Sequence, residues 1–115
     1  MIRIQRVYEP HSSSEPRRVL VDRLWPRGLR KASANIDLWV KTLAPSNELR
    51  QWFGHDPAKW SEFKQRYYSE LAANPEAVEA FLEYLRDGNA TLVYSSREER
   101  LNNAVALQEY VETRL

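Results

Sequence analysis

The chain contains no cysteine, and this absence removes several kinds of chemistry at once. It can form no disulfide, and it has no thiolate metal ligand and no cysteine nucleophile. The two histidines, His11 and His55, show no recognisable metal-ligand spacing, so we expect no metal site. Three glycines are too few for a glycine-rich phosphate loop. The dinucleotide fingerprint and the G-x-S-x-G elbow are also absent, so we expect no cofactor.

Long apolar runs are missing as well. No stretch approaches the roughly 20 residues that a membrane-spanning helix needs. Residues 1–4 alternate like a strand and lack the apolar region of a signal peptide. With 115 residues, 43% of them hydrophobic, residues 1–115 have the size of a single domain with one core. We therefore expect a cytoplasmic protein that has no membrane partner.

Charge is unevenly distributed along the chain, although the net charge is only +1. Residues 1–31 hold eight Lys or Arg against three Asp or Glu, whereas residues 32–115 hold nine against thirteen. The basic block consists of Arg17, Arg18, Arg23, Arg27, Arg30 and Lys31. Such a block attracts phosphates and carboxylates, and the alternative is a solvated basic loop. Arg23 and Arg27 differ from the others because they flank a strand end and a rigid Trp-Pro turn.

The spacing of apolar residues predicts the secondary structure. Strands are predicted over residues 2–8, 18–24 and 91–94, with a loop over residues 9–17. Helices are predicted at five places: residues 35–43, 47–53, 57–71, 75–87, and from about residue 98 to the end. A helical crossover before the last strand favours parallel pairing. The expected fold is α/β, a small, mainly parallel three-stranded sheet flanked by about five helices in a single domain.

Polar side chains follow two of the predicted strands. The exit of the second strand carries Asp22, Arg23, Trp25, Pro26 and Arg27, and the exit of the third carries Tyr94, Ser95, Ser96 and Arg97. Parallel strands place their carboxyl ends at one edge of the sheet, where ligands bind in open α/β folds. Hydroxyls, guanidinium groups and the free amides at the start of the last helix suit an oxyanion such as phosphate. We predict an anion-binding cleft between the two exits.

Several roles remain open at this stage. If the protein is an enzyme, Asp22 or Tyr94 would handle a proton. Alternatively, Asp22 forms a structural ion pair with Arg27. The Trp25 ring could stack on a base or sugar, or it could cover the edge of the core. The other aromatic residues with helical spacing are mostly expected in the core, namely Trp39, Trp52, Trp60, Phe63, Tyr67 and Phe81.

Several sequence blocks occur together in one order. They are Asp-Arg-Leu-Trp-Pro-Arg-Gly (22–28), Leu-Ala-Pro-Ser (43–46), Glu-Leu-Arg-Gln-Trp-Phe (48–53), His-Asp-Pro (55–57) and Phe-Lys-Gln-Arg-Tyr-Tyr-Ser-Glu-Leu (63–71). In these blocks the chain resembles the YeaO-like branch of the domain-of-unknown-function 488 family, from about residue 2 to the end. The resemblance implies a small bacterial or archaeal cytosolic protein with an α/β fold and no established activity.

The resemblance also implies a pocket and two departures from the family pattern. The implied pocket residues are Asp22, Arg23, Pro26, Arg27, Tyr94, Ser95 and Asn102. The cysteine and histidine that other branches place after the last strand have no counterpart here. Leu101 also stands where close relatives are expected to carry histidine. Chemistry that needs those groups is therefore not expected in this chain.

Three functions are compatible with these features. The first is a binding domain, possibly enzymatic, for a phosphate-containing ligand such as a nucleotide or a nucleic acid. The second is a non-catalytic nucleic-acid-binding module, which predicts a steep loss of affinity with salt. The near-zero net charge and the lack of a helix-turn-helix or other base-reading motif count against it. The third is an interaction domain whose aromatic helices pair in a homodimer.

Overall fold

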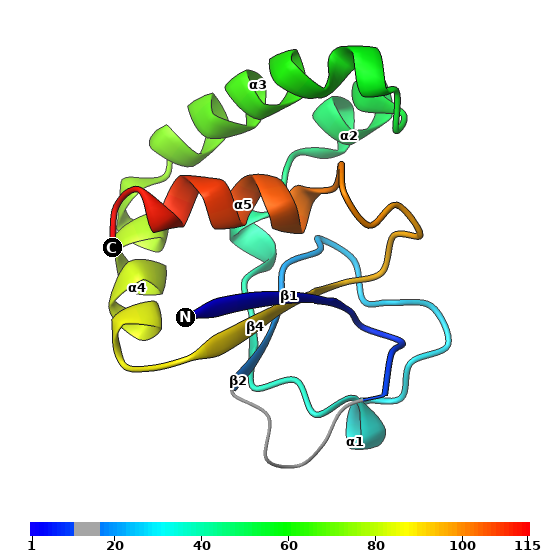
Figure 1. Cartoon of the computed structure of the whole chain (residues 1–115), viewed down its shortest axis with the longest axis vertical. Coiled ribbons are helices and arrows are strands. Elements are labelled where there is room, and N and C mark those ends of the chain that lie inside the picture. The colour runs from blue at the N-terminus through cyan, green and yellow to red at the C-terminus, as the bar shows by residue number, and fades with distance from the viewer. Residues whose placement is uncertain (11–16) are drawn as a thin grey trace.

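The described residues form one sheet of four parallel strands, of which β1, β2 and β4 are labelled in Figure 1. The structure, a computed structural model, describes residues 1–10 and 17–115. The strands are β1 (Ile2–Arg6), β2 (Arg17–Leu20), β3 (Leu38–Trp39) and β4 (Ala90–Tyr94), in the spatial order β1-β4-β2-β3. The α/β class and the parallel pairing are confirmed. The predicted number of three strands is wrong, because β3 forms a fourth.

Five α-helices within the described residues surround this sheet. They are α1 (Lys31–Ala34), α2 (Asn47–Phe53), α3 (Trp60–Ala72), α4 (Pro75–Arg86) and α5 (Asn103–Glu112). Two short 3-10 helices, η1 (Lys41–Leu43) and η2 (Pro57–Lys59), precede α2 and α3. Helices α2, α3 and α5 lie to one side of the sheet and α1 lies to the other (Figure 1). None of the helices formed by residues 1–10 and 17–115 is long and apolar enough to cross a bilayer.

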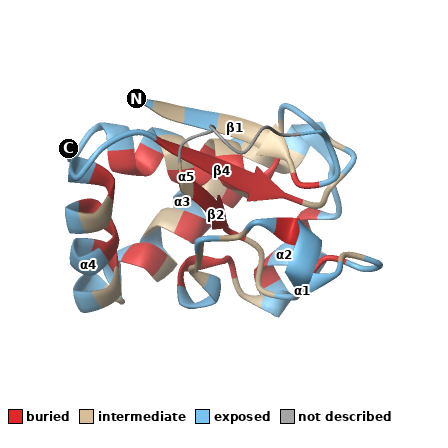
Figure 2. Ribbon diagram, turned by 90° about the horizontal axis from the view of Figure 1, so that it is seen from below, coloured by how far each residue is buried: buried red, intermediate tan, exposed pale blue. Residues whose placement is uncertain are grey.

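The central strands β2 and β4 bury side chains on both faces of the sheet. On one face Val19, Val21 and Leu92 pack into the main core with α2, α3, α4 and α5. On the other face Leu20 and Val93 pack in a smaller cluster under the segment that follows β2. Every residue of β4 is buried, as the red arrow in Figure 2 shows. Two-sided burial explains why β4 has no charged residue and does not alternate between apolar and charged positions.

The helix predicted over residues 35–43 is wrong. This segment forms the two-residue edge strand β3 followed by η1. Its side chains alternate between the two cores, since Leu38 and Val40 pack on the main core while Trp39 packs on the smaller cluster. Alternation of this kind is the period of a strand. The spacing of apolar residues that suggested one face of a helix therefore comes from a strand whose side chains pack into two different cores.

Two predicted boundaries also need correction. The second strand ends at Leu20 instead of residue 24, although the Val21 amide still donates to the Val93 carbonyl at 3.1 Å. The last helix begins at Asn103 instead of about Glu98. The Glu98 carboxylate accepts hydrogen bonds from the backbone amides of Arg100 and Leu101 at 3.0 and 3.1 Å. Local side-chain to backbone bonds of this kind compete with helix formation. The predicted loop over residues 9–17 lies mostly outside the described residues.

Helix α2 has a cap at each end and a second anchor that holds it beside the sheet edge. The Ser46 hydroxyl accepts from the Leu49 amide at 3.2 Å, and Gly54 ends the helix with a φ of 52°. The Glu70 carboxylate on α3 accepts from the Ser46 amide at 2.8 Å and from its hydroxyl at 2.6 Å. The start of α2 is therefore fixed by α3.

Tyr67 on α3 is fully buried, and its hydroxyl donates to the Leu43 carbonyl at 2.5 Å. We expect Tyr67→Phe to lower the free energy of unfolding by about 1–3 kcal/mol, because the Leu43 carbonyl loses its donor in a buried position. Urea unfolding measures the change. The matched control is Tyr8→Phe, since the hydroxyl of the exposed Tyr8 also donates to a backbone carbonyl. A similar loss in both variants would contradict this account.

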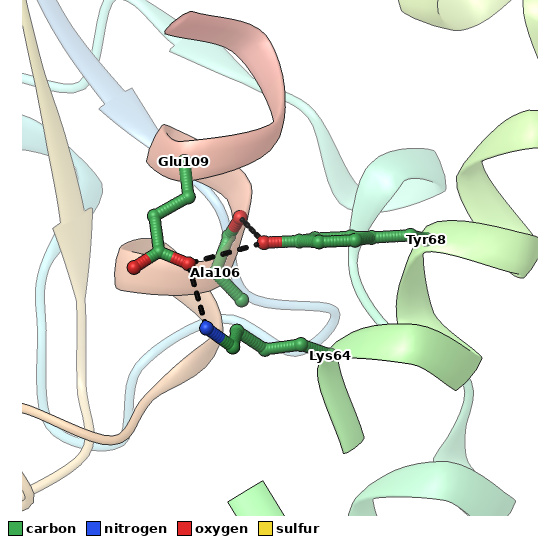
Figure 3. Close-up of polar contacts among 4 residues, drawn as sticks. All are labelled: Lys64, Tyr68, Ala106 and Glu109. Atoms are coloured by element: carbon green, nitrogen blue, oxygen red, sulfur yellow. Dashed lines mark hydrogen bonds and ion pairs between the residues drawn. The ribbon is translucent and has the colours of Figure 1, made fainter. Parts of the chain in front are cut away.

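A polar cluster joins α3 to α5 (Figure 3). The Glu109 carboxylate accepts from Lys64 Nζ at 3.0 Å and from the Tyr68 hydroxyl at 3.3 Å. The same hydroxyl donates to the Ala106 carbonyl at 2.9 Å. Partial burial, followed by the negative charge of Glu109, raises the pKa of Tyr68 to about 12.

The Tyr68 phenol makes stability sensitive to alkaline pH. An unfolded tyrosine ionises near pH 10, whereas folded Tyr68 has a pKa of about 12. Its contribution is complete below about pH 10 and is lost as the pH rises toward 12, because the unfolded chain releases this proton first. Urea unfolding at pH 8 and pH 11 should show a smaller alkaline loss for Tyr68→Phe than for the parent. Identical losses would contradict the assignment. Burial also raises the pKa of Tyr67, so the variant keeps part of the alkaline loss.

Candidate functional site

The polar segments that follow β2 and β4 meet at the carboxyl edge of the sheet. Asp22 Oδ2 accepts hydrogen bonds from the Ser95 amide at 2.9 Å and from the Ser95 hydroxyl at 2.7 Å. Asp22 Oδ1 accepts from Asn103 Nδ2 at 3.1 Å, at the start of α5. Parallel pairing of β2 and β4 places the two exits side by side, as their register requires. The half-buried Asp22 carboxylate therefore joins three segments of the chain.

A cleft of about 690 Å³ opens over this junction. Its walls come from the segment after β2, from α2 and from the segment that leads into α5. It is lined by Asp22, Arg23, Leu24, Trp25, Pro26, Arg27, Pro45, Asn47, Arg50, Gln51, Phe53, His55, Phe63, Ser95, Ser96, Leu101, Asn102 and Asn103. Eight of the ten residues predicted for the site are in this lining. The structure leaves Tyr94 and Arg97 outside it.

Positive charge dominates the described lining of the cleft. Arg23, Arg27 and Arg50 face a single acidic side chain, Asp22. Within residues 1–10 and 17–115, no ion pair joins Asp22 to Arg27 or to another arginine. The structural ion pair considered from the sequence is therefore absent from the described part of the chain. In this cleft the Asp22 carboxylate and the arginine guanidinium groups therefore form no ion pair within the described residues.

The three arginines differ in their exposure and in the hydrogen bonds that their side chains form within the protein. Arg23 donates to the carbonyls of Ala44 at 2.9 Å and of Pro45 at 3.3 Å, so it ties the segment after β2 to the segment before α2. Arg27 is exposed, and its carbonyl accepts from the Tyr8 hydroxyl at 2.7 Å. Arg50 is also exposed and donates to Asn47 Oδ1 at 3.2 Å. Arg27 and Arg50 present the more accessible guanidinium groups.

Trp25 lines the cleft but also belongs to the smaller core. Its indole Nε1 donates to the Leu29 carbonyl at 2.7 Å. Its ring meets Trp39 edge to face, with centroids 5.5 Å apart. These contacts fit the interpretation that Trp25 covers the edge of the core.

Tyr94 and Arg97 are held away from the cleft by their places in the chain. Tyr94 is 3% exposed at the end of β4, and its burial raises the pKa of the phenol. Arg97 is exposed outside the lining. Ser96 serves the turn between β4 and α5, where its hydroxyl accepts from the Glu98 amide at 3.0 Å. None of these side chains is placed beside the Asp22 carboxylate as a proton donor or acceptor.

Asn102 is 2% exposed and caps α5. Its Oδ1 accepts from the Val105 amide at 3.0 Å, and its Nδ2 donates to the Glu98 carbonyl at 2.8 Å. Both ends of the amide are therefore used by the fold. Although Asn102 contributes to the cleft wall, these contacts give it a structural role.

Several lining residues were not predicted. For those on α2, a signal was visible in the sequence. Asn47, Arg50 and Gln51 fall at i, i+3 and i+4 on α2, so they share one helix face. That polar face, opposite Leu49 and Phe53, could have been identified. Asn103 gave no comparable signal.

In the described part of the chain, no group of three or more His, Asp or Glu side chains is placed to hold a metal ion.

His55 also joins the rim of the cleft, after the end of α2. It has a φ of 58°, an uncommon conformation for a residue other than glycine. The Gly-His-Asp-Pro turn was recognisable as a turn in the sequence, but nothing there placed it at the cleft.

The four-stranded parallel sheet, its covering helices and the cleft over the ends of β2 and β4 define a small α/β protein with a polar site at a strand edge. Comparison with known proteins gives this class a family. The family described as "Inactive DUF488-N3 subclade" matches residues 1–115, and the chain belongs to it. The resemblance to YeaO-like proteins of the domain-of-unknown-function 488 family is thereby confirmed.

Similar proteins carry no functional name. The chain is 34% identical over 112 residues to the uncharacterized protein YeaO of Escherichia coli K12, covering 97% of both chains. It is 47% identical over 70 residues to the uncharacterized protein Rv3073c of Mycobacterium tuberculosis H37Rv, covering 61% of this chain and 59% of that protein. An uncharacterized protein of Mycobacterium bovis, Mb3100c, matches to the same extent. No solved structure matches the chain.

The contacts of Asn102 predict an effect on stability. We expect Asn102→Ala to lower the free energy of unfolding by about 1–2 kcal/mol, because α5 loses its cap. Asn102→Ser restores a capping hydroxyl and should lose less. Thermal or urea unfolding of the three proteins measures both changes. If Asn102→Ala were as stable as the parent, the structural role assigned to this side chain would be wrong.

Proposed function

We propose that this protein binds a small phosphate-containing ligand in the cleft over the ends of β2 and β4, without transforming it. The observation that carries the proposal is the charge of the described lining, three arginines against one carboxylate. Arginine is suited to this task, because its guanidinium group donates paired hydrogen bonds to phosphate oxygens.

The size and shape of the cleft agree with a small-molecule ligand. Its volume of about 690 Å³ falls within the range of roughly 300–1,000 Å³ that is typical of ligand pockets. Apolar side chains line part of the wall, among them Phe53 and Leu101, while the arginines and amides supply polar contacts. A mixed lining of this kind can hold the organic part of a phosphate ester as well as its charged group.

Two observations favour binding over catalysis. The Asp22 carboxylate accepts three hydrogen bonds from Ser95 and Asn103, which fix its position within the fold. Tyr94, the other residue considered for proton transfer, lies outside the lining of the cleft. The family description, which calls the subclade inactive, agrees with this view. The proposal therefore gives Asp22 a part in binding and not in proton transfer.

The proposal predicts that two exposed arginines carry the affinity. We expect Arg27→Ala and Arg50→Ala each to weaken binding of inorganic phosphate and of nucleoside monophosphates by about tenfold or more. That factor corresponds to the loss of one hydrogen bond to a charged group. Isothermal titration calorimetry against the parent protein measures the change.

The matched control is Arg3→Ala, which removes the same charge from an exposed position on β1, away from the cleft. Its affinity should equal that of the parent at the same salt concentration. Equal losses in all three variants would indicate a general charge effect and would contradict a site in the cleft. Binding only to oligonucleotides, with a steep salt dependence, would instead favour the nucleic-acid-binding alternative.

A further inference from the structure

The cleft holds the negative charge of Asp22, and no arginine among residues 1–10 and 17–115 forms an ion pair with it. Asp22 lies at the junction of β2, β4 and α5, and it accepts hydrogen bonds from three neutral groups of the described chain, the amide and hydroxyl of Ser95 and the side-chain amide of Asn103. Arg23, which follows Asp22 directly in the chain, turns to the carbonyls of Ala44 and Pro45. The fold therefore separates the carboxylate from the guanidinium groups that share its cleft.

The carboxylate also has hydrogen-bonding capacity left. An ionised carboxylate offers about four acceptor positions on its two oxygens. Asp22 Oδ2 receives two donors from Ser95, whereas Oδ1 receives a single donor from Asn103. Asp22 is half-buried and lines the cleft, and one acceptor position on Oδ1 is filled by no donor of the described residues.

The surrounding contacts fix this acceptor in place. Ser95 binds it from the end of β4, and Asn103 Nδ2, which also donates to the Val21 carbonyl at 3.1 Å, binds it from α5. Because two other segments of the chain hold the carboxylate, it does not have to move in order to accept from a ligand. A preorganised acceptor of this kind improves discrimination between ligands that carry a donor and ligands that lack one.

We propose that the cleft selects phosphate esters that also carry a cationic or N–H donor group, with the phosphate on the exposed arginines and the donor on Asp22. This inference rests on the proposed function and specifies its ligand class. A simple phosphate ester satisfies the arginines but leaves the Asp22 carboxylate facing an anion. An ester with an ammonium or amino group satisfies both charges.

A pair of small probes tests this selection. O-Phosphoethanolamine and ethyl phosphate share a phosphate monoester and a two-carbon chain, but only the first carries an ammonium group. Their dissociation constants are measured at pH 7 and constant ionic strength, by calorimetry or by titration of amide NMR signals. We expect phosphoethanolamine to bind the unaltered protein at least about tenfold more tightly, the ratio typical of one added hydrogen bond to a charged group.

Asp22→Asn provides the matched variant, because it removes the charge and retains the shape of the side chain. The preference for phosphoethanolamine over ethyl phosphate should disappear in Asp22→Asn, so that the two dissociation constants become about equal. Both probes are measured on the same variant, so a general loss of affinity does not affect this comparison. If this variant fails to fold, the ratio in the unaltered protein still decides.

The outcomes separate this inference from the function on which it rests. Equal binding of the two probes, or tighter binding of ethyl phosphate, would overturn the selection by Asp22 and leave phosphate binding in place. A preference that persists in Asp22→Asn would overturn the role of this carboxylate. Failure of the protein to bind either probe, inorganic phosphate or nucleotides would overturn the proposed function as well.

Discussion

The hydrogen bonds from Ser95 to the Asp22 carboxylate are the interaction on which the site depends. They join the ends of the two central strands just past the last backbone pairing of β2 with β4. Asn103 extends the same junction to the first turn of α5. Because one carboxylate joins all three segments, the floor of the cleft is tied to the sheet beneath it, while exposed residues lie around its rim.

The fold divides the polar residues of this edge into two groups. In the first group the side chains form hydrogen bonds with backbone groups and so stabilise the fold. This group contains Arg23, Ser96 and Asn102. Arg27 and Arg50 lie exposed on the segment after β2 and on α2, and they supply accessible positive charge. The polar residues at this edge of the sheet therefore include several that stabilise the fold and only some that are accessible to a ligand.

The sequence predicted the general location of the cleft better than the roles of its residues. Continuous apolar strands and a helical crossover were enough to place Asp22 and Ser95 at one edge of a parallel sheet. The same periodicity failed at residues 35–43, because a short edge strand between two cores imitates helical spacing. Arg50 was missed because the sequence shows the polar face of α2 but not that tertiary packing brings this helix over the strand ends. Some polar side chains, such as that of Asn102, form their hydrogen bonds with the backbone. The periodicity of the sequence does not show which ones, because this depends on three-dimensional contacts.

The central claim is that the cleft over the Asp22–Ser95 junction is the binding site of this protein. Amide NMR spectra recorded during a titration with a phosphate ester test it most directly. The account predicts that the largest shifts fall on Ser95, Asn103, Arg27 and Arg50. Shifts concentrated instead on the outer face of α3, around Gln65 and Ser69, would contradict it, as would a spectrum that does not change.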